Sequence, residues 1–419
     1  MILRAQYVVP VDQPPIRHGA VRIHRDRITA VDHADAVQPP AGDPVIDFGL
    51  AAIIPGLVNA HTHLELSALA GRVPPGPDFV RWINTLIDVR RRNCSDANAI
   101  ADAVRGGVRA SLAAGVTTIG DITARPDVVR PVLKHGPIRV VSFGEVIAVG
   151  AGRGILQDRL HAAMDGQHAS EHLTIAVSPH APYSVEPDGI RACADAAAEN
   201  DLRLCMHLAE TRDEVQFVET GGGPFRAFLT DLGLWDDTVP CPRVHPVVLA
   251  DACAALTPRT LLAHVNYVDD AHIELLAARG ASVAYCPRTH AAFGHDPHRF
   301  VDMLLAGVNV CIGTDSLASA PSLSPLDELR FLCAGHGDGH SPHPRPAADV
   351  LFAMATVRGA RALGLADETG SLAVGKSADF TIIPLTADGP RHPLDNILAS
   401  NVGPIETYVR GKRVHGPRL

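Results

Sequence analysis

The 419-residue sequence contains no run of about 18 apolar residues, the length that a membrane-spanning helix needs. Its N-terminus also lacks a basic segment followed by an apolar one, so we expect no signal peptide. Basic residues are not in excess, because 37 Lys and Arg stand against 46 Asp and Glu, a net charge of −9. We therefore expect a protein that binds neither membranes nor nucleic acid.

Cysteine pairs with metal or redox spacing are also absent. None of the eight cysteines lies in a CxxC motif, which excludes a zinc ribbon and a thioredoxin-like site. Cys205, Cys286 and Cys311 lie in apolar runs and are predicted to be buried and reduced. Reduced cysteines without a signal peptide indicate the cytoplasm. Some of the 22 histidines lie in a Gly- and Pro-rich tract at residues 335–343, which we interpret as a surface loop.

Both ends of the chain contain short strand-like segments. Residues 21–23 and 28–31 flank a polar turn, which predicts a hairpin, and residues 379–383 form a similar segment near the C-terminus. We expect residues 1–55 and 366–419 to form one small β-sandwich together.

The middle of the chain alternates short apolar runs with alanine-rich segments of helical period, such as residues 100–113 and 270–279. Strands that alternate with helices indicate a parallel sheet. Eight such units predict an α/β fold, a (β/α)8 TIM barrel over residues 56–365. The runs are residues 57–61, 116–121, 138–143, 173–178, 202–207, 260–264, 281–286 and 308–314.

Histidines and a carboxylate close several of these runs. His61 and His63 end the first run, and alternate residues of a strand point the same way, so both imidazoles can face one ion. His207 ends the fifth run, His264 the sixth, and Asp315 follows the eighth. Barrel active sites lie at the C-terminal ends of the strands. We therefore predict that His61, His63, His207 and Asp315 hold one cation and leave a position for water.

Around these positions the sequence resembles the amidohydrolase superfamily over nearly its whole length. It is most similar to the aminohydrolases of cytosine-deaminase type, which include deaminases of S-adenosylhomocysteine, guanine and aminodeoxyfutalosine, and triazine hydrolases. The motifs that carry the resemblance are residues 54–63 (IPGLVNAHTH), 207–211 (HLAET), 263–265 (AHV), 313–316 (GTDS) and 370–379 (GSLAVGKSAD).

The resemblance implies a metal-dependent hydrolase of C–N bonds other than peptide bonds. A bound ion lowers the pKa of its water from about 15.7 towards about 7 and so supplies hydroxide, which would attack a heterocyclic carbon bearing an amino group and release ammonia. Glu210 would move a proton from the water to a ring nitrogen. His264 would act as a base or an electrostatic clamp, and Asp315 would bind the ion and orient the nucleophile.

The fourth run decides the expected number of metal ions. Binuclear members of the superfamily are expected to carry a bridging carboxylated lysine there, but this run ends in Ser178, Pro179 and His180. We expect one divalent ion, zinc in the first place, while iron accepts the same nitrogen and oxygen ligands. The HExxH motif and the HxE…PCxxC signature of the other zinc deaminase fold are absent.

Five residues are predicted to contact the substrate. His180 matches a Ser-Pro-His element that touches the substrate in similar enzymes, although a packing histidine is the alternative. Glu65 points into the barrel mouth as an acceptor for hydroxyl or NH groups, or as a partner of a ligand histidine. Trp82 covers the base or fills core, Arg288 binds a carboxylate, and Ser316 lies beside Asp315.

Glu65 and Arg288 together favour aminodeoxyfutalosine, an intermediate of menaquinone biosynthesis with an adenine, a ribose and a benzoate. Deamination of S-adenosylhomocysteine, methylthioadenosine or guanine is the close alternative. Hydrolysis of an amide or a chloro-triazine is a second enzyme class, and an inactive barrel that only binds a partner is a third possibility. We expect a small-molecule substrate and a homodimer.

Residues 370–377 match the phosphate-binding pattern GxxxxGK[ST]. A P-loop follows a strand and opens a helix. Here the preceding residues are not strand-like and the following ones are a strand, so we predict a turn and no nucleoside triphosphate site.

Overall fold

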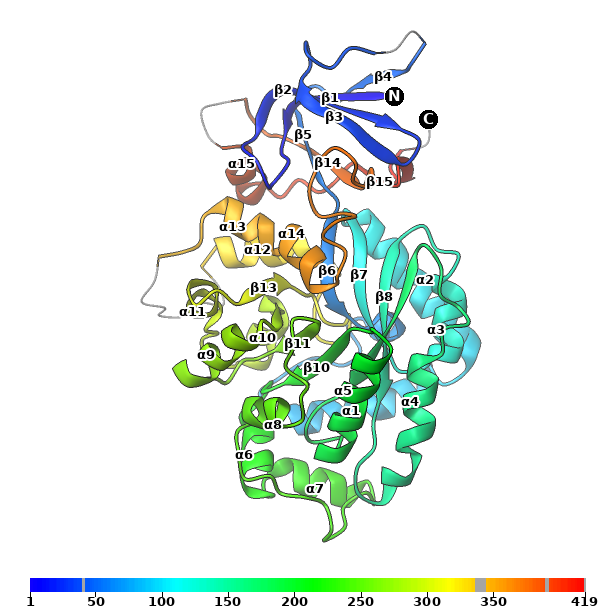
Figure 1. The fold of residues 1–419 in the computed structure, drawn as a ribbon, viewed down its shortest axis with the longest axis vertical. Helices are drawn as coiled ribbons and strands as arrows, with labels where there is room; N and C mark the ends of the chain where they lie inside the picture. The colour runs from blue at the N-terminus through cyan, green and yellow to red at the C-terminus, as the bar shows by residue number, and fades with distance from the viewer. Residues whose placement is uncertain (40–41, 336–343, 389–391, 418–419) are drawn as a thin grey trace.

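The computed structural model describes residues 1–39, 42–335, 344–388 and 392–417. Two sheets of eight strands organise the molecule, a parallel barrel and a second sheet built from both chain ends (Figure 1). Most of the histidine-rich tract that we interpreted as a surface loop, residues 336–343, lies outside the described residues.

The barrel strands follow one another in chain order, each paired in parallel with the next. The predicted (β/α)8 barrel is therefore confirmed, and each of the eight predicted runs overlaps one strand. The strands are β6 (Leu57–Thr62), β7 (Val116–Thr123), β8 (Arg139–Val146), β9 (Leu173–Pro179), β10 (Leu204–Leu208), β11 (Thr260–His264), β12 (Ser282–Tyr285) and β13 (Asn309–Ile312).

Small and medium apolar side chains fill the inside of the barrel. Ala176, Cys205 and Ala284 belong to this inner cluster, whereas Leu262 and Val310 belong to the larger cluster between the strands and the helices. A filled lumen makes the barrel a packed core and not a pore, so polar chemistry is confined to its ends.

Asn59 and Thr314 close the barrel between its first and last strands. The Asn59 side chain donates to Thr314 Oγ1 at 2.7 Å and accepts from the Thr314 backbone at 3.0 Å. The backbone N–H groups of Thr314 and Asp315 both donate to the His61 carbonyl at 3.1 Å. This closure brings His61 and Asp315, from opposite ends of the barrel sequence, to the same place.

The helices surround the barrel. The α9 helix shows how local sequence sets their limits, because Asp269 and His272 form a capping box at its start and Gly280, at φ 70°, ends it. The helical elements are η1 (Leu64–Leu69), α1 (Phe79–Asn93), α2 (Ala97–Ala113), α3 (Pro126–Leu133), η2 (Gly150–Ile155), α4 (Leu156–Met164), α5 (Pro187–Glu199), α6 (Arg212–Thr220), α7 (Pro224–Asp231), α8 (Pro246–Ala252), α9 (Asp270–Arg279), α10 (Pro287–Phe293), α11 (Phe300–Leu305), α12 (Pro325–Cys333), α13 (Ala348–Met354), α14 (Val357–Ala362) and α15 (Pro393–Ala399). Among the residues described, no helix combines the length and apolar character of a membrane span.

The second sheet joins the two chain ends at one end of the molecule, where both termini lie (Figure 1). Its central pairing is β5 with β14, one strand from each chain end. In spatial order the strands are β16 (Lys412–His415), β15 (Glu406–Val409), β14 (Phe380–Pro384), β5 (Ala51–Pro55), β1 (Ile2–Val8), β2 (Ile16–His24) and β3 (Arg27–His33), with β4 (Val45–Asp47) beside β1. We propose the predicted limits, residues 1–55 and 366–419 against 56–365, as the boundaries of two structural units.

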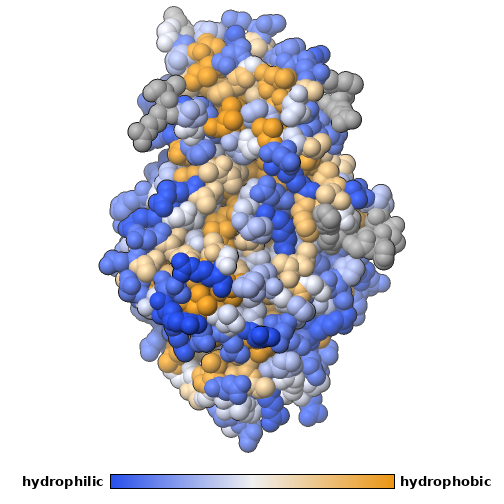
Figure 2. Space-filling view, turned by 180° about the vertical axis from the view of Figure 1, so that it is seen from behind, coloured by the Kyte–Doolittle hydropathy of each residue, from blue (hydrophilic) through white to orange (hydrophobic). Residues whose placement is uncertain are grey.

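Figure 2 shows hydrophobic residues on the end of the molecule that the terminal sheet forms, and further hydrophobic residues among hydrophilic ones on the barrel. Val45, Ile46 and Leu50 are among its exposed apolar side chains. The predicted homodimer stays a prediction.

The segment that matches the P-loop pattern leads into β14 and opens no helix. Lys376 Nζ donates to the Thr369 carbonyl at 3.3 Å and to Ser371 Oγ at 2.8 Å, within the same turn. The lysine side chain thus bonds within the segment itself.

Candidate metal centre and active site

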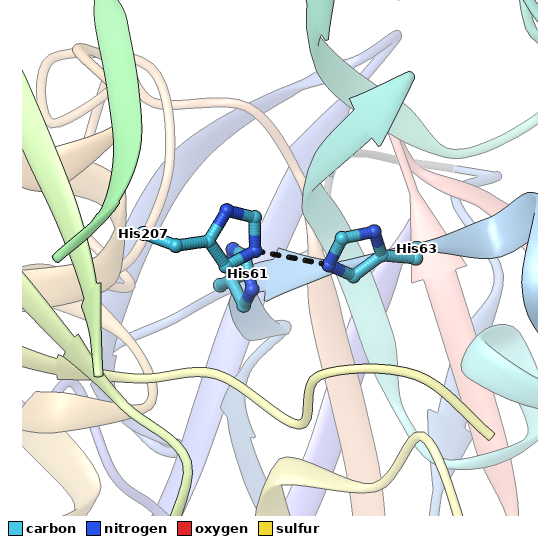
Figure 3. Close-up of side chains that lie close together, drawn as sticks. All are labelled: His61, His63 and His207. Atoms are coloured by element: carbon cyan, nitrogen blue, oxygen red, sulfur yellow. Dashed lines mark hydrogen bonds between the residues drawn. The ribbon is translucent and has the colours of Figure 1, made fainter. Parts of the chain in front are cut away.

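Three histidine side chains meet at the C-terminal end of the barrel (Figure 3). One ring nitrogen from each of His61, His63 and His207 lies within 4.8 Å of the others. The Nε2 atoms of His63 and His207 are 3.3 Å apart. The strand β6 supplies His61 and leads into His63, while β10 supplies His207, so the barrel itself positions this histidine cluster.

Asp315 adds a carboxylate to the histidine cluster. Its Oδ1 lies 3.4 Å from His63 Nε2 and 3.8 Å from His61 Nε2. Burial raises the pKa of Asp315 to about 6, and Ser319 Oγ donates to its Oδ2 at 2.5 Å. The backbone at Asp315 is left-handed, with φ 57°, and so turns the carboxylate away from the path of the strand.

The histidines fit a divalent cation. His61 is fully buried, and neither of its ring nitrogens has a hydrogen-bond partner among the described residues. Burial and the neighbouring histidines lower the pKa of His61 and His63, which keeps both rings neutral. Unpartnered buried nitrogens are costly unless an ion or water satisfies them, and neutral imidazole nitrogens bind zinc.

A backbone carbonyl fixes the tautomer of His207. The Nδ1 atom lies 3.0 Å from the carbonyl oxygen of His180, so Nδ1–H donates and Nε2 keeps its lone pair toward the cluster. Burial also lowers the pKa of His207 to about 3. Such an outer hydrogen bond is a common companion of a histidine that binds metal.

Glu210 and His264 lie next to each other beside the cluster. The Oε1 atom of Glu210 is 3.4 Å from His264 Nε2, and both side chains are almost completely buried. Burial, with Asp315 and Glu214 nearby, raises the pKa of Glu210 well above its usual value. The His264 ring centroid lies 5.4 Å from that of His61. A group that can carry a proton thus lies beside the histidine cluster.

The turn that carries Glu210 is held by a second buried carboxylate. Glu214 accepts from the backbone N–H groups of Ala209 and Glu210, each at 2.8 Å. The φ of Ala209 is 48°, a conformation that needs such support. Asn266 also donates to the Glu210 carbonyl at 2.9 Å. Together these bonds fix the backbone from which Glu210 projects.

A cavity of about 250 Å³ opens over the cluster, and we call it the catalytic cavity. Four of the predicted substrate contacts line it: Glu65, Trp82, His180 and Ser316. Trp82 does so from α1, donates its indole N–H to the Val73 carbonyl at 3.2 Å and packs edge-on against Phe293. The wall of the catalytic cavity is mainly apolar, which suits a flat heterocycle.

Glu65 is held by Arg90, a residue that the sequence did not single out. Arg90 Nη2 lies 2.5 Å from Glu65 Oε1, while Glu65 Oε2 is buried without a partner among the described residues. Burial raises the pKa of Glu65 to about 7. One carboxylate oxygen is thus paired, and the other faces no donor.

Arg288 is the one predicted contact that the structure does not bring to the catalytic cavity. Its Nε donates to Glu328 Oε1 at 2.7 Å, and its Nη2 donates to the carbonyl and hydroxyl of Ser322 at 2.9 and 3.0 Å. Glu328 is fully buried and also accepts from the Arg288 backbone at 2.9 Å. These contacts link α10 to α12 and occupy the guanidinium.

Glu145 also lines the catalytic cavity, and the sequence reasoning missed it. The predicted run stopped at residue 143, but β8 continues to Val146. Val141 and Phe143 face the inside of the barrel, so the alternation of a strand places Glu145 on the same side, at the mouth. That alternation was the signal that could have found it.

Comparisons with known proteins agree with this geometry. The sequence profile of the Amidohydrolase family matches residues 52–414. The 5'-deoxyadenosine deaminase of Methanothermobacter thermautotrophicus is 30% identical over 379 residues, which cover 89% of this chain and 82% of that protein. A 5-methylthioadenosine/S-adenosylhomocysteine deaminase of Nitratidesulfovibrio vulgaris is 31% identical over 395 residues, covering 92% and 84%.

A solved structure is similar over almost the whole length. The adenosine deaminase from Xanthomonas campestris, crystallised with bound zinc, superposes with a TM-score of 0.82 at 25% identity. The match covers 99% of this chain and 92% of that one.

Proposed function

The chain belongs to the amidohydrolase family and is a hydrolase of C–N bonds, and we propose that it is a single-metal aminohydrolase that releases ammonia from an adenine-bearing nucleoside. The observation that carries the proposal is the convergence of His61, His63, His207 and Asp315 beside the Glu210–His264 pair. Two of the relatives and the zinc-containing structure described above are deaminases of adenine nucleosides by name.

In this proposal the three histidines and Asp315 hold one divalent ion, zinc before iron. The bound ion supplies a water acidic enough to be a nucleophile at neutral pH. We propose a single ion because a second one would need a bridging lysine at the end of β9. That strand ends at Pro179, and His180 follows it.

Glu210 is the proton carrier of the proposed reaction. Burial raises its pKa and so favours the protonated form, from which the carboxyl can protonate a ring nitrogen and return to the charged form. His264, whose pKa is lowered by burial, stays neutral and can accept a hydrogen bond from the nucleophile or the leaving group. The fixed turn around Glu214 keeps the carboxyl in place throughout.

The catalytic cavity supports recognition of a base and a sugar. Trp82 offers an aromatic wall, and the free Oε2 of Glu65 can accept from a sugar hydroxyl. His180 presents Nε2 to the same space. Aminodeoxyfutalosine fits these groups, as do 5'-deoxyadenosine and S-adenosylhomocysteine. For a distal carboxylate, we propose Arg159 as the binding group instead of Arg288, because Arg159 lines a neighbouring cavity and Arg288 is occupied.

Ammonia release from a panel of compounds tests the proposal. Purified protein is assayed with adenosine, 5'-deoxyadenosine, S-adenosylhomocysteine, aminodeoxyfutalosine, guanine and cytosine, and its metal content is measured. We expect ammonia from one or more of the adenine-bearing compounds and about one metal ion per chain. Failure with every adenine-bearing compound would overturn the proposed substrate class and leave amide or chloro-triazine hydrolysis to be tested.

The variant His207→Ala tests the metal centre. Loss of one of three imidazole ligands is expected to abolish activity and to lower bound metal at least tenfold. The matched control is His135→Ala, because His135 is exposed and lies at the far end of α3. Full metal content and activity in His207→Ala would disprove the assignment.

A further inference from the structure

Glu145 stands between two cavities. It lines the catalytic cavity and also an adjoining cavity of about 330 Å³, which we call the annex. The two share Arg90, Glu145 and several apolar residues, and Arg125 and Arg159 belong to the annex alone. A group that extends from the catalytic cavity into the annex therefore passes Glu145.

The Glu145 carboxylate has no hydrogen-bond donor among the residues that the structure describes. Its side chain is only 10% exposed, and within the described part of the chain the nearest titratable nitrogen is His180 Nε2, at 3.8 Å from Oε1. That distance is too long for a direct hydrogen bond. A buried carboxylate without a donor is unfavourable, so it is poised to bind one.

His180 supplies no proton to Glu145 in the tautomer that protonates Nδ1. Ser184 donates its hydroxyl proton to the Ala181 carbonyl at 3.1 Å. Ser184 Oγ also lies 2.6 Å from His180 Nδ1, a contact in which either atom can be the donor. When Ser184 donates to Ala181, Nδ1 carries the ring proton and Nε2 keeps a lone pair. In that tautomer, and with Glu145 ionised, two acceptors face one another at 3.8 Å.

Two of the three arginines that line the cavities are engaged elsewhere, and the third, Arg159 of the annex, forms no ion pair with Glu145 in the described part of the chain. Arg90 pairs with Glu65 at 2.5 Å, and Arg125 binds Asp127 through two hydrogen bonds of 3.0 and 2.7 Å. A ligand can therefore supply the donor that the Glu145 carboxylate lacks. A hydroxyl or an ammonium group, which both donate protons, fits that place.

We propose, on the basis of the proposed function, that Glu145 is a specificity-determining residue that accepts a hydrogen bond from a hydroxyl or ammonium group at the 5' position of the nucleoside. The base must reach the metal centre, and the 5' carbon carries whatever extends from the sugar toward the annex. This is also the position at which the relatives' named substrates differ, between 5'-deoxyadenosine and 5-methylthioadenosine.

The test compares three substrates that differ only at the 5' carbon: adenosine, 5'-amino-5'-deoxyadenosine and 5'-deoxyadenosine. The assay is run at about pH 8.5, because burial raises the pKa of Glu145 to about 7 and the carboxylate must be ionised. We expect kcat/KM to be about tenfold higher for a substrate with a 5' donor, the effect of one charge-assisted hydrogen bond.

Two substitutions at Glu145 distinguish a hydroxyl donor from an ammonium donor. Glu145→Leu is expected to bring the three kcat/KM values within about threefold of one another. Glu145→Gln keeps an acceptor oxygen without the charge, so it is expected to lose the preference for ammonium and keep part of that for hydroxyl. Metal content and unfolding temperature show that each variant is folded. The control is Glu274→Gln, an exposed position on α9 away from both cavities.

The outcomes distinguish the inference from the function on which it rests. A wild-type enzyme that deaminates all three substrates equally, or variants that keep the wild-type ratio, would overturn the role of Glu145 alone. A wild-type enzyme that deaminates none of the adenine nucleosides would overturn both the proposed function and the inference.

Discussion

At the scale of the residue, Glu210 is the side chain whose position points most directly to a role in the reaction. It is buried, faces His264 at 3.4 Å and has a raised pKa. Glu210→Gln keeps the shape but cannot carry a proton, so kcat is expected to fall by about 10²- to 10⁴-fold. Steady-state kinetics and metal analysis check this, with KM and metal content little changed. The control is Glu219→Gln, exposed on α6. A kcat within threefold of the wild-type value would remove Glu210 from the reaction.

Single residues also show what a sequence can predict about this site. His61, His63, His207, His264 and Asp315 end or follow apolar runs, and the position of a strand end in a barrel is set by topology alone. The contacts that long side chains make are not set by topology. Arg288 follows such a run, yet its guanidinium turns to Glu328, on a helix that no local pattern ties to it.

At the scale of the element, the turn between β10 and α6 converts a strand end into an active-site wall. The Glu214 carboxylate accepts from two backbone N–H groups there, and Thr211 caps α6 by accepting from the Glu214 N–H at 3.0 Å. The sequence shows Glu210 three residues after His207. It does not show the hydrogen bonds to Glu214 that orient the Glu210 backbone. This support depends on a left-handed backbone at Ala209. The sequence does not predict that conformation, because alanine rarely adopts it.

Glu214→Gln tests this turn. The amide can accept from only one of the two N–H groups and directs its own NH₂ at the other, so one buried donor is left unpaired. We expect the free energy of unfolding to fall by about 1–3 kcal/mol. We also expect kcat to fall more than KM changes, because Glu210 is displaced. Denaturant unfolding and kinetics measure both. Unchanged kcat beside the lower stability would limit Glu214 to a structural role.

At the scale of the whole molecule, the terminal sheet is joined to the barrel by polar contacts at the end away from the active site. Arg139, the first residue of β8, lies 3.3 Å from Asp379, whose other oxygen accepts from the Arg410 backbone at 2.7 Å. Thr381 and Thr407 donate to the carbonyls of Gly115 and Leu112 at 2.9 and 2.8 Å. The sequence predicted two units, but these contacts between distant segments could not be derived from local patterns.

Arg139→Ala separates the stability of this junction from catalysis. Asp379 is completely buried, and removal of its cation leaves an unpaired charge, so the free energy of unfolding is expected to fall by about 3–5 kcal/mol. Because β8 begins at Arg139 and the metal centre lies at the opposite ends of the strands, kcat and metal content at low temperature are expected to stay at wild-type values. Arg109→Ala, an exposed position on α2, is the control. A single, lower unfolding transition would show that the terminal sheet and the barrel unfold together through this junction. Two separate transitions would show that they are independently stable, and a loss of activity without loss of stability would refute the separation of junction and site.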